Sequence, residues 1–156
     1  MKSDVPNRRA DDAKSAWPSF VTAYALLITS IEERLRAAGL PELAWYDALW
    51  ALERAPQGRL RMHELAEKTV ITRSNLTRLI DRLQAAGLVA RDRNCPDRRG
   101  AFAVLTTPGR VMRRKMWMVY GAAIKDLFDG HLNAAETLQM RAIFARILKA
   151  ARFSTC

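Results

Sequence analysis

The segment 72–82 gathers side chains that can hydrogen-bond to nucleic acid. The hydroxyls of Thr72, Ser74 and Thr77 can donate to phosphate oxygens. Arginine, here Arg73 and Arg78, can bridge two phosphate oxygens or the O6 and N7 atoms of guanine, and Asn75 is a side chain that reads base edges. Apolar residues recur among them at the spacing of one helix face, at Leu76, Leu79, Ile80 and Leu83. The pattern predicts a helix with a buried face and a polar face sized for a major groove.

A second basic cluster follows within a short distance along the chain, and its members are Arg93, Asp97, Arg98 and Arg99. Segment 71–115 holds eleven Lys and Arg against three Asp, which is +8 of the net charge of +10. A charge run alone is equally compatible with a solvated face. Because it coincides with the polar helix, we interpret it as a surface for a polyanion, and adjacent arginines at a loop tip suit a minor groove.

Length and composition exclude several classes of protein. The chain has 156 residues, 49% of them hydrophobic and 27% charged, which is enough for one domain with an appended assembly element. Two cysteines and two histidines stand too far apart for a zinc site, so we expect no metal and no cofactor. No catalytic constellation is evident, and the uncharged run 15–31 is too polar for a membrane span, so we expect a cytoplasmic protein that is not an enzyme and has no membrane partner.

The elements that would position the basic clusters are separated by glycine, proline and capping residues. Helices are predicted from about 14 or 17 to 38, from Pro41 to about 55, over 62–68 and 72–86, from Thr107 to about 130, and from Asn133 to about 153. Two strands, 88–93 and 101–105, are predicted to form a hairpin between the fourth and fifth helices. The fold class is therefore mainly α with a small β-wing.

Five short motifs in order resemble the multiple-antibiotic-resistance regulator (MarR) family of winged-helix transcription factors. They are Glu64–Glu67, Thr72–Leu83, Gly87–Arg91, Asp97–Gly100 and Leu105–Gly109. The resemblance implies a homodimer that binds a pseudo-palindromic double-stranded DNA operator, with residues 73–78 in the major groove. It further implies that Asp97 pairs with Arg99 and that Arg99 enters the minor groove. We therefore expect a polar tail at 1–13, a dimerisation region at 14–55 and 107–156, and a winged helix-turn-helix lobe at 56–106.

The sequence itself also indicates that a second copy of the chain is present. A helix over 17–38 would be about 33 Å long, more than one domain of this size needs to cover its own core. The last helix adds a second apolar stripe, and surplus apolar stripes at both ends of the chain indicate a second subunit.

Three hypotheses about function and regulation stay open. Regulators that resemble this chain are commonly repressors released by a small aromatic or phenolic effector, and Trp17, Trp45, Tyr46 and Asp47 could line such a pocket, although core packing of the aromatics explains them as well. Cys95, among arginines, could instead make a redox-sensing regulator. The third hypothesis is a nonspecific architectural protein, which would share the charge but would not need Asn75, Thr77 or an arginine and aspartate pair in the wing.

Overall fold

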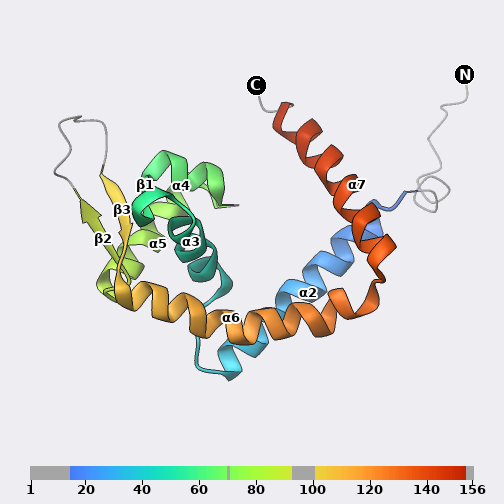
Figure 1. Cartoon of the computed structure of the whole chain (residues 1–156), viewed down its shortest axis with the longest axis horizontal. Helices are drawn as coiled ribbons and strands as arrows, with labels where there is room; N and C mark the ends of the chain where they lie inside the picture. Colours follow the sequence, from blue (N-terminus) through green and yellow to red (C-terminus); the bar gives the residue numbers. More distant parts are fainter. Residues whose placement is uncertain (1–14, 70, 93–100, 154–156) are drawn as a thin grey trace, which may run out of the picture.

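The fold is an α-helical chain with one small sheet, seen in a computed structural model that describes residues 15–69, 71–92 and 101–153. Figure 1 shows a lobe at one end of the molecule and a pair of helices, α2 and α7, at the other, with α6 running between them. In chain order the elements are α2 (Trp17–Ala37), α3 (Leu43–Glu53), η1 (Pro56–Gly58), β1 (Arg59–Arg61), α4 (Met62–Lys68), α5 (Arg73–Ala85), β2 (Val89–Asp92), β3 (Phe102–Leu105), α6 (Thr107–Leu127), η2 (Asp129–His131) and α7 (Ala134–Phe153).

The lobe is built around a core of buried aliphatic side chains from α3, α4, α5 and the sheet. Helix α5 contributes Leu76, Leu79, Ile80 and Leu83, each no more than 2% exposed. The sheet is antiparallel in the order β1-β3-β2, with Leu60 opposite Ala103 and Val89 opposite Leu105. The structure thus confirms a mainly helical fold with a small antiparallel wing.

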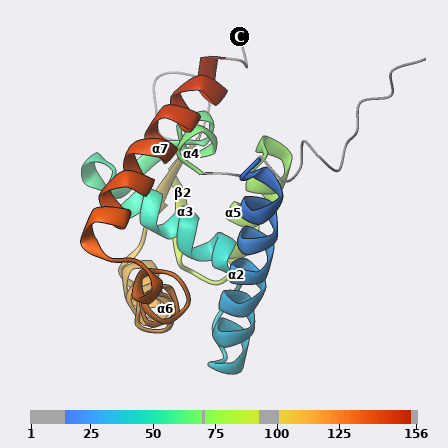
Figure 2. The same ribbon diagram turned by 90° about the vertical axis from the view of Figure 1, so that its right-hand side faces the viewer.

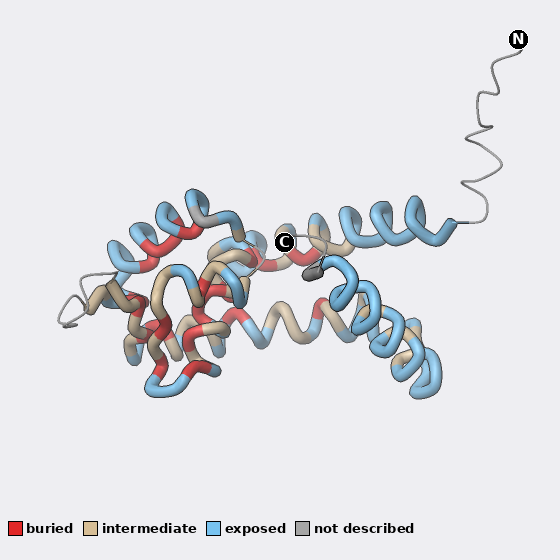
Figure 3. The backbone as a smooth tube through the Cα atoms, turned by 90° about the horizontal axis from the view of Figure 1, so that it is seen from above, coloured by how far each residue is buried: buried red, intermediate tan, exposed pale blue. Residues whose placement is uncertain are grey.

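A second buried cluster joins α6 to α2 and to the outer side of α3. It comprises Ile31, Leu35, Leu43, Tyr46, Met116 and Ala123. Met112 and Trp45 pack against both clusters, so the two cores are continuous through α3 and α6. Figure 3 shows the consequence, because buried positions concentrate in the lobe and along the middle of α6, while the start of α2 and most of α7 are exposed.

Local signals set several helix ends, as the sequence predicts. Gly87 follows α5 with φ 72°, a left-handed conformation that costs glycine little, and its amide closes the helix on the Gln84 carbonyl at 2.9 Å. Before α7, the Asn133 and Glu136 side chains each accept the other's backbone N–H, at 2.8 and 3.0 Å. This reciprocal pair is a capping box, and it sets the helix start that the sequence predicts near Asn133.

Four local expectations need correction. Helix α3 begins at Leu43, because the Glu32 carboxylate accepts the Leu43 amide, so Pro41 precedes the helix rather than opening it. Helix α5 begins at Arg73, so Thr72 precedes the helix at its N-cap position, and its side chain makes no capping bond. Helix α6 ends at Leu127, three residues short of Gly130, and a 3-10 turn follows. Strand β1 was absent from the predicted hairpin, which the structure extends to three strands.

Within the described residues, no helix combines the length and the apolar content that crossing a bilayer requires.

Candidate nucleic-acid interface

Helix α5 turns its polar residues away from the lobe core. Its buried residues 76, 79, 80 and 83 form one face, and Ser74, Arg78 and Asp81 follow one another at spacings of three and four on the opposite face. All three are exposed, as are Thr72, Asn75 and Thr77. Arg73 is the first residue of the helix, and its side chain lies outside the described part of the structure. The predicted reading side chains therefore share one helix that the core holds by its other face.

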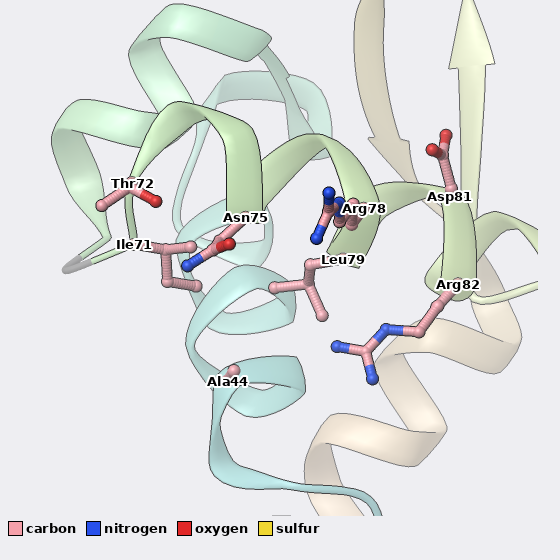
Figure 4. Close-up of a pocket in the computed structure, with 8 residues that line it drawn as sticks. All are labelled: Ala44, Ile71, Thr72, Asn75, Arg78, Leu79, Asp81 and Arg82. Atoms are coloured by element: carbon pink, nitrogen blue, oxygen red, sulfur yellow. The ribbon is translucent and has the colours of Figure 1, made fainter.

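One flank of α5 borders a hollow of about 660 Å³ that opens between this helix and the start of α3. Figure 4 looks into this hollow, with Asn75, Leu79 and Arg82 of α5 on one side and Ala44 of α3 on the other. Asn75 therefore belongs to the side of α5 that faces α3, and Thr72, Arg78 and Asp81 also border this hollow.

Some arginines of the basic segment 71–115 form ion pairs with acidic side chains of the protein. The Arg82 guanidinium pairs with the Glu42 carboxylate and lies 5.9 Å from the centre of the Trp45 ring. Arg91 of β2 pairs with Asp81 of α5, with 2.6 Å between Nη2 and Oδ1. These pairs fasten α5 to its neighbours and leave less positive charge free for a ligand than the sequence suggests.

The sheet carries basic residues that the sequence analysis missed. In β1, the Arg59 guanidinium lies 4.0 Å and that of Arg61 5.1 Å from the centre of the Phe102 ring. Arg59 also pairs with Asp92 across the sheet at 3.4 Å. The sequence pattern that could have predicted this strand is the alternation of Arg59, Leu60 and Arg61, which is typical of a strand with one buried face.

The predicted wing residues Arg93, Asp97, Arg98 and Arg99 lie outside the described residues, and so does Cys95. The described parts of the wing are the two strands on either side, which end at Asp92 and begin again at Phe102.

The four residues predicted to line an effector pocket do not come together within one chain. Trp17 is 67% exposed at the start of α2, where its ring contacts Phe20, and Phe20 contacts Phe144 of α7. Trp45, Tyr46 and Asp47 lie on α3, with Trp45 packed against the core clusters. Trp17 is thus separated from the other three, because α2 carries it to the far end of the molecule (Figure 1).

Tyr46 instead belongs to an aromatic cluster between α3 and α6. Its ring centre lies 6.3 Å from that of Trp50, 5.9 Å from that of Trp117 and 5.0 Å from that of Tyr120. Burial raises the pKa of the Tyr46 and Tyr120 hydroxyls, and burial together with Glu32 raises the pKa of the Asp47 carboxyl. Within the described ranges, no group of three or more His, Cys, Asp or Glu residues could hold a metal ion.

Comparison with known proteins agrees with this geometry. The model of the MarR family matches residues 38–100. The chain is similar to AbsC, a MarR family transcriptional regulator from Streptomyces coelicolor, with 31% identity, 88% of this chain and 92% of AbsC covered, and a TM-score of 0.81. It is also similar to Sco3205, another such regulator from that organism, solved in complex with DNA: 30% identity, 86% and 84% covered, TM-score 0.80.

A more distant likeness concerns the fold alone. BpsR from Bordetella bronchiseptica, whose DNA binding is regulated by 6-hydroxynicotinic acid, shares 23% identity over 86% of this chain and 94% of its own, with a TM-score of 0.75. Two relatives at 30% identity or above, each aligned over most of its length, establish the family. The structure agrees with these relatives, because α5 has a buried apolar face and an exposed polar face and stands beside a three-stranded wing. The chain therefore belongs to the MarR family of DNA-binding transcriptional regulators, which are not enzymes.

Proposed function

We propose that the protein is a homodimeric repressor that binds two half-sites of a pseudo-palindromic operator and is released by a small aromatic effector. The observation that carries this proposal is the exposed polar face of α5, which is rigidly seated on the lobe core. A major groove about 12 Å wide accepts one helix, and Ser74, Asn75, Thr77 and Arg78 supply donors and acceptors for phosphates and base edges.

Exposed apolar side chains at the other end of the molecule support the dimer. On α2, Trp17, Phe20 and Tyr24 are 67%, 43% and 57% exposed and follow a helical stripe. On α7, Ile147 and Leu148 are 54% and 56% exposed. Figure 2 faces this end of the molecule and shows α2 and α7 at the front. A contiguous apolar surface of this kind is typical of an interface, and a second copy of the same helices is its natural complement.

A symmetric pair of lobes dictates the form of the DNA site. Two α5 helices can enter successive major grooves on one face of the duplex only if their centres lie about 34 Å apart, one turn of B-DNA. We propose that Arg99, paired with Asp97, reaches the flanking minor groove from each wing, where the negative potential favours an arginine.

The binding mode is tested by selection of bound sequences from random DNA, followed by titration of the selected operator. We expect Asn75→Ala to weaken binding by about 1–3 kcal/mol at fixed salt. Gln84→Ala is the matched control, because Gln84 is an exposed amide in the last turn of the same helix. Equal affinity for the operator and for competitor DNA would identify a nonspecific architectural protein instead.

An effector site is proposed beside the aromatic cluster of α3 and α6. Trp50 and Trp117 are 39% and 46% exposed although their rings approach that of Tyr46, so aromatic surface remains available to a ligand. The DNA binding of BpsR, which has a similar fold, is regulated by 6-hydroxynicotinic acid, and this supports a search among aromatic acids. A ligand releases DNA when it binds one lobe separation more tightly than the other. Screening aromatic and phenolic acids for loss of operator binding tests the proposal, with Trp117→Ala as the variant expected to lose the response.

Oxidation is the competing route of release. If Cys95 is the sensor, low peroxide abolishes operator binding by the parent protein and leaves Cys95→Ser unaffected. Equal loss in both proteins would exclude Cys95 as the sensor.

A further inference from the structure

Arg113 lies in α6 at the point where this helix passes from the lobe toward α2. Its Nε atom is 2.6 Å from the Oε2 atom of Glu53, at the end of α3. The two side chains are only 14% and 19% exposed, so this ion pair is largely withdrawn from water. Arg110, one turn earlier in α6, places its Nη1 atom 3.8 Å from the other carboxylate oxygen of Glu53.

The same guanidinium also contacts two aromatic residues of α3. It lies 5.4 Å from the centre of the Trp50 ring. Its proximity to Tyr46 partly offsets the rise in the Tyr46 pKa that burial causes. Tyr46, Trp50 and Glu53 are separated by four and three residues, so they share one face of α3. A single side chain of α6 therefore contacts α3 over two helical turns.

Helix α6 is anchored on both sides of this contact. Toward the lobe, Gly109 is buried against Leu88 and Leu105 of the sheet region. Toward the other end, Met116 and Ala123 belong to the buried cluster shared with α2. Because α6 is continuous from Thr107 to Leu127, a rotation of the lobe relative to the far half of α6, which packs on α2, must displace Arg113 from Glu53 or bend the helix.

We propose that Arg113 and Glu53 form a clamp that fixes the angle between the lobe and the dimer helices and so selects the half-site spacing of the operator. The inference rests on the proposed binding of two half-sites. Arg113 and Glu53 are positioning residues in this account, because they act on DNA only through the placement of α5. Partial burial strengthens the attraction between the Arg113 guanidinium and the Glu53 carboxylate, whereas a neutral amide in place of the carboxylate holds the guanidinium less tightly and permits a wider range of geometries.

The test measures binding to the selected operator and to versions with one or two base pairs added to or removed from its spacer. The variants are Glu53→Gln and the double variant Glu53→Gln with Arg113→Met. The double variant removes both charges of the Arg113–Glu53 pair, so it leaves no buried guanidinium unpaired and guards against a loss of folding; Arg110, which also approaches Glu53, is 40% exposed and keeps its contact with water. The control is Asp126→Asn, because Asp126 also pairs with an arginine, Arg34, at 2.9 Å, but joins α6 to α2 outside the lobe.

We expect the wild-type protein and Asp126→Asn to prefer one spacing sharply. In both clamp variants the ratio of affinities between the preferred and altered spacings should fall roughly two- to thirtyfold, while the dimer mass stays unchanged. A folded double variant with the wild-type ratio would overturn the inference. A wild-type protein that is indifferent to spacing would overturn the two-half-site proposal as well, so the two failures are distinguishable.

A measurement without DNA tests the same clamp. In a background that lacks Cys95 and Cys156, a spin label at Gln84→Cys reports the distance between the two α5 helices of a dimer. The distance distribution should broaden in the double variant and remain unchanged in Asp126→Asn. Identical distributions in all three proteins would overturn the inference whatever the DNA titrations show.

Discussion

Replacement of Gly109 by alanine tests how tightly α6 is fastened to the lobe. A Cβ atom at this position would lie 2.2 Å from the carbonyl oxygen of Leu88 and 2.7 Å from Cδ1 of Leu105. The Leu88 backbone has little freedom to retreat, because its amide donates to the Leu83 carbonyl at 2.9 Å and its carbonyl accepts from the Thr106 amide at 3.2 Å. The new methyl group must therefore displace the backbone or push α6 away from the sheet.

The expected cost follows from three contributions. Overpacking against fixed atoms costs about 1–3 kcal/mol. Loss of the bond between Thr106 and Leu88 adds about 1 kcal/mol. The helix preference of alanine over glycine returns at most about 1 kcal/mol. The free energy of unfolding should thus fall by about 2 kcal/mol, and the melting temperature by roughly 4–8 °C for a chain of this size.

Thermal unfolding of Gly109→Ala beside Gly121→Ala provides the assay and its control. Gly121 lies in the same helix, but a Cβ atom there would meet only the Trp117 ring, at 3.1 Å. That side chain is 46% exposed and can turn away, so the control should unfold within about 1 kcal/mol of the wild type. A melting temperature of Gly109→Ala equal to the wild-type value, or an equal loss in both variants, would refute the close packing inferred for Gly109.

Three further perturbations probe the cap of α6, the half-buried carboxyl of Asp47 and the basic face. Thr106→Ala should lower the free energy of unfolding by about 1–2 kcal/mol in urea titrations, because the Thr106 hydroxyl accepts from the Gly109 amide at 3.1 Å and donates to the Gly87 carbonyl at 2.8 Å. Because the pKa of Asp47 is raised in the folded state, its contribution to stability is present below the ordinary carboxyl pKa and is lost as pH rises through the folded value. Asp47→Asn should therefore unfold at a higher temperature than the wild type at neutral pH, and this gain should disappear in acid. Arg78→Ala should weaken operator binding more than Arg82→Ala in titrations at one salt concentration, because Glu42 holds the Arg82 guanidinium; equal losses would contradict this assignment.

Local signals predicted the elements and most of their ends. The capping residues Asn133 and Glu136 act within four residues of each other, and Gly39 and Gly87 each adopt the positive φ that ends a helix. Such features depend on nearby backbone alone, so the sequence carries them almost completely. The apolar stripe of α5 was equally readable, because its period matches the helix repeat.

Contacts between residues that lie far apart in the sequence could not be predicted from local patterns. The pair of Arg82 and Glu42 spans 40 residues, and no spacing rule connects them. Strand β1 has only three residues, and it forms because Leu60 finds a place opposite Ala103 in the lobe core. The sequence places Trp17 with the aromatic residues of α3 near one junction, whereas its position depends on the direction of α2, which no local pattern specifies.

The arrangement of acids explains why net charge is an imperfect guide to the binding surface. Arg91 pairs with Asp81, Arg82 with Glu42 and Arg113 with Glu53. These arginines therefore link secondary-structure elements to one another. Arg78 has no ion-pair partner among the residues that the structure describes, and it lies opposite the buried face of α5. Paired arginines therefore fix where α5 stands, and in the proposed binding mode the unpaired cations are the ones that contact phosphates.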